Sequence, residues 1–260
     1  MTEGFLVIPG SGTLTPANPA VLYGEGVFET LHLRPDGPWL LTEHLDRLER
    51  SAALLELTPP PRADLETLAA RAPLPAAEGA LRLVVTPGPV SFATVAAIPD
   101  TVRRQRREGI SLITADLGVT TRPPWSLAAA KTLSYAENLA ARRWAQRQGA
   151  DDVLWLTADG HALEAPTANL VWLAGDTLCT VPPAGILRGT TAAHLLSRAG
   201  ELGLRAEERM ITAAGLGATD GIWLASSLRG LAEAHTLDGV PRPRSPWTPR
   251  LLALLGYPTP

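Results

Sequence analysis

The chain has 260 residues, of which 45% are hydrophobic, and its formal net charge is −3 at pH 7. This length suits one large or two small domains, and the small charge gives no general attraction to nucleic acid or to an anionic membrane. The single cysteine, Cys179, excludes an internal disulfide framework, and the N-terminus shows no basic and apolar leader pattern. We therefore expect a protein of the reducing cytoplasm.

The first half of the chain has the pattern of a mixed α and β unit. Short runs rich in Val, Ile, Leu and aromatic residues are typical of strands, whereas apolar residues spaced by three and four indicate a helix. We expect strands at Phe5–Ile8, Val27–Leu33, Trp39–Leu41, Leu81–Thr86 and Ala93–Ile98, and helices at Glu43–Leu57 and Ala63–Arg71.

One basic run follows, made of Arg103, Arg104, Arg106 and Arg107. Two interpretations stay open for it. A run of charge is usually a solvated turn or helix end, and the alternative is a patch that attracts an anionic substrate.

The second half begins after a loop that contains Arg122-Pro123-Pro124-Trp125. We place the domain boundary there, which gives an N-terminal α+β domain over residues 1–118 and a C-terminal α/β domain over residues 119–260. The expected helices are Ser134–Gln148 and Thr191–Leu202, and the expected strands are Asp152–Leu156, Asn169–Leu173, Thr177–Val181 and Gly221–Ala225. The proline-rich tail from Val240 predicts irregular surface packing.

Lys131 is the only lysine in the chain, and 22 of the 23 basic residues are arginine. Arginine replaces lysine at a solvated surface, but its guanidinium stays protonated and cannot attack a carbonyl. The surviving lysine is therefore a candidate Schiff-base lysine, with an accidental surface position as the alternative. The five histidines are scattered, without the spacing of a metal site, and no Walker-type phosphate loop is present.

Two further motifs follow Lys131 along the chain. A predicted hairpin carries Glu164 and Asn169, and the segment Gly185–Thr191 opens a helix with Gly189, Thr190 and Thr191. Backbone N–H groups at a helix N-terminus, with hydroxyls beside them, form a cradle for a phosphate. An amine, a carboxylate and a phosphate cradle are together what pyridoxal 5′-phosphate requires.

These motifs closely resemble the class IV aminotransferases, which are fold-type IV pyridoxal-phosphate enzymes. The resemblance runs from Tyr23-Gly24-Glu25-Gly26-Val27-Phe28-Glu29-Thr30 to Ser226-Ser227, in the family's order. It implies an α+β fold of the D-amino-acid aminotransferase type, with two α/β domains and the cofactor between them. It also implies a homodimer.

The resemblance implies a role for each matching residue. Lys131 is the Schiff-base lysine, and Glu164 is the partner of the pyridine nitrogen, with Asn169 at the family's spacing. The phosphate is expected to bind Arg47, Thr190, Thr191 and Ser227. Leu187 is expected to lie against the cofactor ring, and Tyr135 near the lysine. Each of these residues alone also has an ordinary structural interpretation, such as a helix cap or a surface carboxylate.

Within the family the sequence is most similar to the 4-amino-4-deoxychorismate lyases, which release 4-aminobenzoate and pyruvate on the way to folate. The features in favour are the short chain, the segment Ser226–Gly230 and the approach Ser126–Lys131. The segment Pro87–Ser91 lacks the basic, glycine-rich stretch of some lyases. A transaminase of branched-chain or D-amino acids is therefore the alternative.

The expected substrate is a small molecule that carries an amine and carboxylates. Planar guanidinium groups pair with carboxylates at two points, so Arg229, Arg82 and Arg122 are candidates to bind it, with ordinary ion pairing as the alternative for each. Thr30 and Tyr135 are candidate pocket hydroxyls. We expect no metal, no nucleic acid and no membrane as partners.

Overall fold

The computed structural model describes residues 4–7, 12–118 and 121–259. The chain divides into two compact units. The first unit is Met1–Pro99 with Leu127–Tyr135, and the second unit is Asp100–Ser126 with Ala136–Pro260. Each unit has helices packed on its own sheet, so the predicted α+β class is confirmed.

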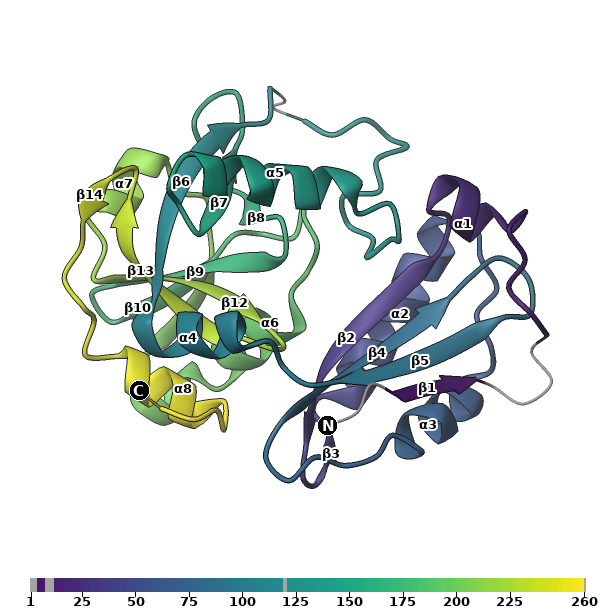
Figure 1. Ribbon diagram of the computed structural model, residues 1–260. Helices are drawn as coiled ribbons and strands as arrows, with labels where there is room; N and C mark the ends of the chain where they lie inside the picture. Colours follow the sequence, from purple (N-terminus) through teal and green to yellow (C-terminus); the bar gives the residue numbers. More distant parts are fainter. Residues whose placement is uncertain (1–3, 8–11, 119–120, 260) are drawn as a thin grey trace. The chain divides into compact units, whose positions relative to one another are not determined.

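The first unit contains an antiparallel sheet in the order β1-β5-β4-β2-β3 (Figure 1). Its strands are β1 (Gly4–Val7), β2 (Val27–Arg34), β3 (Gly37–Pro38), β4 (Gly79–Val85) and β5 (Ser91–Ala96). These strands confirm the predicted strand positions except for Trp39–Leu41, which is wrong. Leu40 has a left-handed backbone with φ of 55°, and the next residue, Leu41, already begins a helix. Ile8, the last residue of the first predicted strand, lies outside the described residues.

The helices of the first unit, among its described residues, are α1 (Pro19–Tyr23), α2 (Leu41–Leu54) and α3 (Arg62–Ala70). The apolar residues of α2 recur at helical spacing, and its Leu45, Leu48 and Ala52 pack against Val27 and Leu31 of β2. The same core includes residues of α3, β4 and β5. Because α2 packs on β2, polar side chains that face each other across this contact become buried together.

The second unit contains a larger mixed sheet in the order β11-β10-β9-β12-β13-β6-β7. Two short strands join it, since β8 pairs with β9 and β14 with β13. Its strands are β6 (Ile110–Asp116), β7 (Asp152–Leu156), β8 (Glu164–Ala165), β9 (Ala168–Ala174), β10 (Thr177–Thr180), β11 (Arg205–Glu208), β12 (Gly221–Ser226), β13 (Gly230–Leu237) and β14 (Val240–Pro241).

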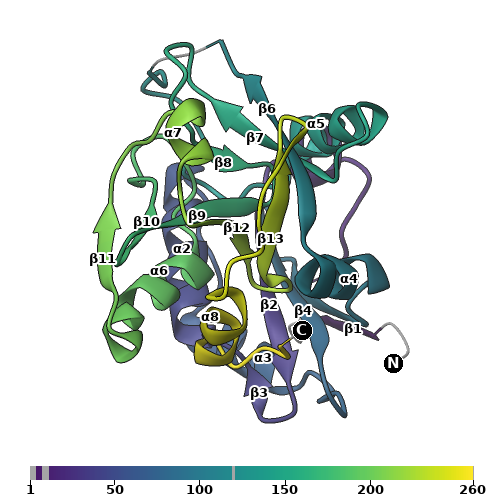
Figure 2. The same ribbon diagram turned by 90° about the vertical axis from the view of Figure 1, so that its left-hand side faces the viewer.

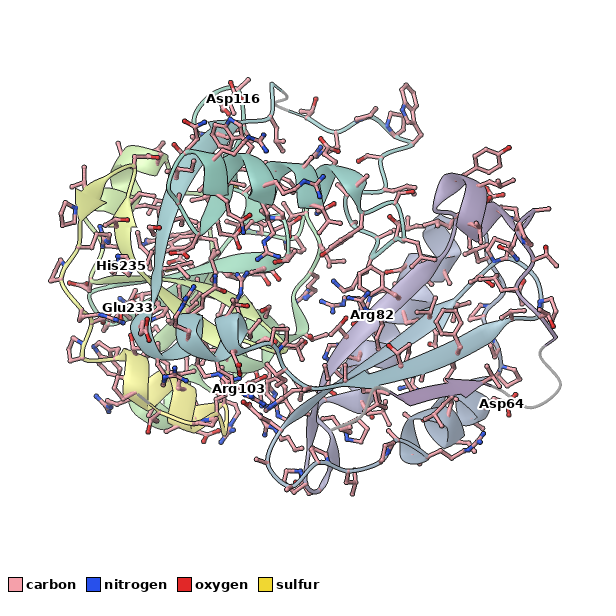
Figure 3. All side chains as sticks on the ribbon, viewed as in Figure 1. Asp64, Arg82, Arg103, Asp116, Glu233 and His235 are labelled. Atoms are coloured by element: carbon pink, nitrogen blue, oxygen red, sulfur yellow. The ribbon has the colours of Figure 1, made fainter. Side chains whose placement is uncertain are left out.

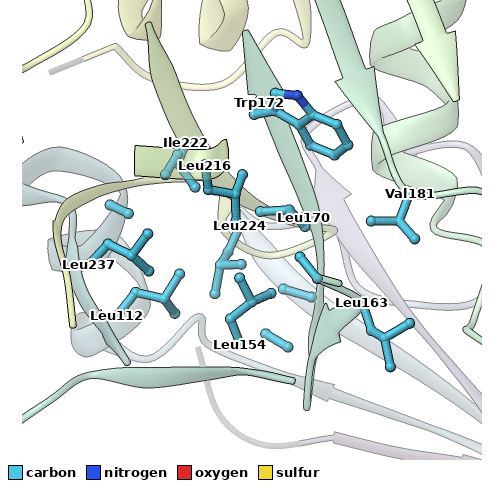
Figure 4. Close-up of a cluster of buried hydrophobic side chains, with 14 of the residues drawn as sticks. Leu112, Leu154, Leu163, Leu170, Trp172, Val181, Leu216, Ile222, Leu224 and Leu237 are labelled. Atoms are coloured by element: carbon cyan, nitrogen blue, oxygen red, sulfur yellow. The ribbon is translucent and has the colours of Figure 1, made fainter. Parts of the chain in front are cut away.

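The helices of this unit are α4 (Asp100–Glu108), α5 (Ala136–Arg147), α6 (Thr190–Ser197), α7 (Ala213–Gly217) and α8 (Thr248–Leu254). Figure 2 shows α4 and α8 beside β13, and α6 on the same sheet near β12. A buried apolar cluster, which includes Leu154, Leu170, Trp172 and Leu224, forms the core (Figure 4). None of the helices in the described ranges is long and apolar enough to cross a membrane.

The division between the units differs from the predicted boundary at residues 118 and 119. Strand β6 pairs with β13 and β7, which places residues 110–116 in the second unit. Lys131 lies in the first unit, because the neighbouring Thr132 forms a bridge with Val27 of β2.

The C-terminal tail is more ordered than its prolines predict. It contains α8, whose Thr248, Leu251 and Leu252 are buried. Pro249 stands in the first turn of this helix, where no backbone N–H is needed for the helical ladder. Glu233 of β13, labelled in Figure 3, accepts hydrogen bonds from the backbone N–H of Ser245 at 2.5 Å and from the hydroxyl of Thr248 at 2.7 Å. The prediction of irregular surface packing is therefore wrong for residues 245–254.

Candidate functional site

Lys131 is held along the edge of β2. The N–H of Phe28 donates to the carbonyl oxygen of Lys131 at 3.0 Å, and Thr132 bridges to Val27. The N–H of Lys131 donates to the hydroxyl of Ser51, on α2, at 3.0 Å. Backbone contacts on both sides therefore fix the position from which the lysine side chain extends.

The Lys131 amine lies beside two aromatic rings. Its nitrogen is 4.7 Å from the ring centre of Phe28 and 5.7 Å from that of Tyr135. The two rings meet edge to face, with centres 5.3 Å apart. The guanidinium carbon of Arg82 is 4.8 Å from the same Phe28 ring, and Thr30 is paired with Arg82 between β2 and β4. The structure thus brings Lys131, Tyr135 and Arg82 around Phe28, with Thr30 opposite Arg82 in the neighbouring strand.

Arg47 belongs to a buried ionic group in the same unit. Its guanidinium donates to both carboxylate oxygens of Glu29, at 2.7 and 2.8 Å. The Nδ1 atom of His44 lies 2.6 Å from the same carboxylate. Glu29 and His44 are fully buried and Arg47 is 6% exposed. Because Glu29 holds Arg47 at two points, the guanidinium has a fixed orientation.

The protonation states in this group follow from burial and charge. Burial alone would raise the pKa of the Glu29 carboxyl, but Arg47 and His44 outweigh it and hold that pKa well below its usual range. Burial lowers the pKa of His44 below its ordinary value of 6.5, although Glu29 opposes the shift. We therefore assign Glu29 as a carboxylate and His44 as a neutral ring that donates through Nδ1.

Glu164 and Asn169 face each other across the hairpin of β8 and β9 in the second unit. One oxygen of Glu164 accepts from the N–H of Leu187 at 3.1 Å, and the other accepts from the side-chain amide of Asn169 at 3.2 Å. The same amide donates to the carbonyl oxygen of Leu187 at 2.7 Å. The three predicted residues therefore form one hydrogen-bonded unit that fixes the Glu164 carboxylate.

The N-terminus of α6 adjoins this unit. Gly189 is its N-cap, and a Cβ atom there would overlap the side-chain amide of Asn169. Thr190 and Thr191, in the first turn, are 8% and 2% exposed, and the hydroxyl of Thr191 has no hydrogen-bond partner among the described residues. A buried hydroxyl without a partner in this part of the chain, beside the N–H groups of a helix start, suits the binding of an anion.

Ser227 and the remaining arginines lie in other parts of the second unit. Ser227 follows β12 directly and is 9% exposed. Arg122 lies against the loop that carries Leu187, because a Cβ atom on Gly185 would be 3.2 Å from its side chain. Arg229 is 4% exposed, and its guanidinium donates to the buried Asp152 at 2.9 Å. This burial favours a structural role for Arg229 over the predicted contact with a substrate carboxylate.

No group of three or more His, Cys, Asp or Glu side chains that could hold a metal ion occurs within residues 4–7, 12–118 and 121–259. Cys179 is buried on β10, and burial raises the pKa of its thiol.

Comparison with known proteins assigns the family. The sequence model of the family described as amino-transferase class IV matches residues 26–237, which is most of the chain. The chain belongs to this family.

Relatives of this class IV aminotransferase cover almost its whole length. It is 39% identical to a bifunctional aminodeoxychorismate lyase / D-amino acid transaminase of Mycobacterium tuberculosis, over 94% of this chain and 92% of that protein. A solved structure described as a hypothetical aminotransferase from Mycobacterium tuberculosis, in its PLP-bound form, is 36% identical, with a TM-score of 0.90 and 97% of both chains covered. A fold IV-transaminase of Curtobacterium pusillum is 33% identical, with a TM-score of 0.88, over 98% of this chain and 97% of that one. The expected fold type IV is confirmed.

Sequence reasoning missed Glu29 and His44 as parts of the site of this class IV aminotransferase. Glu29 falls within the predicted strand Val27–Leu33, where a charged residue is expected to face solvent, and His44 lies in the predicted helix. One signal was available, because Glu29 interrupts an otherwise apolar pattern at a position that faces α2. Its partners could be identified only after α2 was placed on β2.

Proposed function

We propose that the chain is a pyridoxal 5′-phosphate enzyme that cleaves 4-amino-4-deoxychorismate to 4-aminobenzoate and pyruvate. The observation that carries the assignment of a pyridoxal 5′-phosphate enzyme is the placement of Lys131, and the choice of the lyase rests on the similarity of Ser226–Gly230 and Ser126–Lys131 to the lyases. The only primary amine on a side chain is fixed by backbone hydrogen bonds on both sides and lies over Phe28 and Tyr135.

The side chains of the site fit this cofactor. A phosphate suits the N–H groups at the start of α6 and the buried Thr191 hydroxyl, which has no hydrogen-bond partner within the described ranges. Arg47, Thr190 and Ser227 are the other proposed phosphate ligands, and Leu187 is the proposed apolar contact of the ring. When bound, the cofactor supplies an aldehyde that reacts with an amine and a ring that accepts electrons.

Each proposed residue then has a definite task. The Lys131 amine would hold the cofactor and would move protons at the reacting carbon of the substrate. Tyr135 and Thr30 supply hydroxyls near that amine. The Glu164 carboxylate would keep the pyridine nitrogen protonated, and the N–H of Leu187 and the amide of Asn169 keep this carboxylate in place.

The chemistry of the substrate favours Arg82 and Arg122 as carboxylate ligands. Arg82 is exposed and lies beside the ring that the Lys131 amine also contacts. Arg122 is half-buried against the loop that leads to Leu187. A guanidinium in such a position can bind a carboxylate at two points.

A transaminase is the second candidate. The relative from Mycobacterium tuberculosis carries both activities in its name, lyase and D-amino acid transaminase. Another structure of the solved relative is described as bound to alpha-ketoglutarate and PMP. Branched-chain amino acids, also expected as alternative substrates, belong in the same assay. We also propose a cytoplasmic homodimer, which a sizing measurement tests.

The deciding experiment compares the two reactions on one preparation. Purified protein with pyridoxal 5′-phosphate is given 4-amino-4-deoxychorismate, and in parallel a panel of D- and branched-chain amino acids with 2-oxoglutarate. Release of 4-aminobenzoate supports the lyase, whereas fast amino transfer without that release rejects it. Lys131→Ala should abolish both the absorbance band of the bound cofactor and the activity. A variant that keeps both would refute the role of Lys131.

A further inference from the structure

The turn that carries Ser227 is supported by side chains from distant parts of the second unit. Residues 226–230 connect β12 to β13, with Ser226 paired to Gly230. Gly230 has a left-handed backbone with φ of 65°. A short loop that ends in a left-handed glycine is a common way to close a hairpin.

The carbonyl groups of three successive residues in this 226–230 turn, Ser227, Leu228 and Arg229, each accept a hydrogen bond from a buried side chain. Arg106 of α4 donates from Nε to the carbonyl oxygen of Arg229 at 2.9 Å and from Nη2 to that of Leu228 at 2.6 Å. The hydroxyl of Tyr257, which follows α8, donates to the carbonyl oxygen of Ser227. Arg106 and Tyr257 are 3% and 4% exposed. The backbone between the two paired residues of the turn is therefore held at each of these three carbonyl groups.

Arg106 and Tyr257 also contact each other and enclose the turn. The guanidinium carbon of Arg106 is 4.9 Å from the ring centre of Tyr257. A Cβ atom on Gly230 would lie 2.8 Å from the Tyr257 ring, so only glycine leaves room for that ring. The Arg229 side chain ties the same turn to β7 through Asp152. These contacts form one packed group behind Ser227.

The charges of this group suit an anion on the turn. Arg106 and Arg229 contribute two buried positive charges, and Asp152, the ionic partner of Arg229, contributes one negative charge. Arg142 adds a further positive charge 3.8 Å from Asp152. A carbonyl that accepts from a cation is polarised, and this polarisation strengthens the hydrogen bonds of the linked peptide groups. The surroundings of Ser227 thus favour a phosphate.

We propose that Arg106 and Tyr257 are positioning residues for the cofactor phosphate. They hold the 226–230 turn in the conformation in which Ser227 binds that phosphate. This inference rests on the proposed function, because it assumes that the phosphate belongs to pyridoxal 5′-phosphate. It gives a role to one buried arginine of the basic run, which the sequence left open between a solvated turn and an anion patch, and to the C-terminal tail, which the sequence predicted as irregular surface packing.

The test compares two ligands that differ only in the phosphate. The cofactor is removed from the full-length protein, and the dissociation constants of pyridoxal 5′-phosphate and of pyridoxal are measured by spectroscopic titration. The variants are Tyr257→Phe, which removes only the hydroxyl, and Arg106→Gln. Arg107→Gln and Tyr23→Phe are matched controls, because Arg107 has a side chain that is 57% exposed and Tyr23 is 74% exposed.

We expect Tyr257→Phe to weaken pyridoxal 5′-phosphate binding about fivefold to tenfold, which corresponds to the loss of one ordinary hydrogen bond. Arg106→Gln should weaken it about 10-fold to 100-fold, because two hydrogen bonds from a charged donor are lost. The dissociation constant of pyridoxal in these two variants should stay within about twofold of its value in the parent protein. In the two control variants, the dissociation constants of both ligands should stay within the same range.

Two results would overturn the inference while the proposed function stands. In one, Tyr257→Phe binds pyridoxal 5′-phosphate as the parent protein does. In the other, both ligands are weakened equally, which indicates a general structural role. A parent protein that does not bind pyridoxal 5′-phosphate overturns the proposed function and the inference together. If Arg106→Gln fails to fold, the nearly isosteric Tyr257→Phe decides alone.

Discussion

The guanidinium of Arg47 contacts both carboxylate oxygens of Glu29, with its Nε 2.7 Å from one oxygen and its Nη2 2.8 Å from the other. This two-point ion pair joins α2 to β2 inside the core of the first unit, where Glu29 is fully buried. A buried charge is tolerated only while its partner is present. Arg47, a proposed phosphate ligand, therefore also stabilises the packing of α2 on β2.

Glu29→Gln should lower the free energy of unfolding by about 3–5 kcal/mol, because it leaves the buried charge of Arg47 without its partner. Urea denaturation of the cofactor-free protein measures this change. Glu66→Gln is the matched control, since Glu66 pairs with Arg62 at the surface and such pairs contribute little. Equal, small effects of the two substitutions would show that the Glu29–Arg47 pair does not stabilise the unit.

Acid should destabilise the protein in two stages. The folded protein holds the pKa of His44 below 6.5 and that of Glu29 below 4.5, so the unfolded chain binds these protons first as the pH falls. The contribution of these two groups to the free energy of unfolding is then fully present above about pH 6.5. It decreases below that pH as His44 is protonated, and it decreases further below about pH 4.5 as Glu29 is protonated. Melting temperatures between pH 7.5 and 4 check the sign, and His44→Gln should remove the first stage. A melting temperature that rises as the pH falls from 7 to 5 would contradict the assignment.

The hydrogen-bonded unit around Glu164 should not tolerate a methyl group at residue 189. In Gly189→Ala the new Cβ overlaps the amide of Asn169, which donates to both Glu164 and Leu187. We expect a loss of about 1–3 kcal/mol in stability, the usual cost of overpacking, and a changed absorbance of the bound cofactor. Gly200→Ala is the control, because nothing lies within 4 Å of a Cβ atom there. Thermal unfolding and absorbance spectra of both variants measure the effect.

The sequence predicts the helices and strands whose apolar residues repeat regularly better than those whose residues have low preference for the structure they form. Strand β2 and helix α2 were predicted because their apolar residues repeat with a clear period. Strand β13 was missed because Gly, Ala, Glu and His within Gly230–Leu237 have low strand preference, and Glu233 is buried only because Ser245 and Thr248 bind it. Helix α8 was missed because its prolines suggested a loop, whereas Pro249 stands in the first turn.

In the candidate site, too, local sequence patterns predict some residues, whereas others depend on contacts that the sequence does not show. Lys131, Glu164 and the start of α6 lie in short motifs, and a motif can be identified without knowing its partners. The roles of Glu29, Arg106 and Tyr257 depend on contacts between residues that are far apart in the chain, such as Arg106 with the carbonyl of Arg229. The sequence pattern does not identify the partner of any of these three residues, so only the packed structure shows what each one binds.

Arg82 should contribute to substrate binding more than to chemistry. Its guanidinium carbon is 4.8 Å from the ring centre of Phe28, and the Lys131 amine is 4.7 Å from the same centre. A substrate that reacts at the amine therefore comes within reach of Arg82, and a carboxylate on it gains a charge-assisted pair. Arg82→Gln should raise KM about 10-fold to 100-fold and change kcat only a few-fold, because the pair forms before the reaction and persists through it.

Arg82→Lys should restore part of the loss, whereas Arg104→Gln, at an exposed position of α4, should behave as the parent protein. Steady-state kinetics with the substrate found in the two-reaction assay measure both constants, and a loss confined to kcat would assign Arg82 to the chemical step instead.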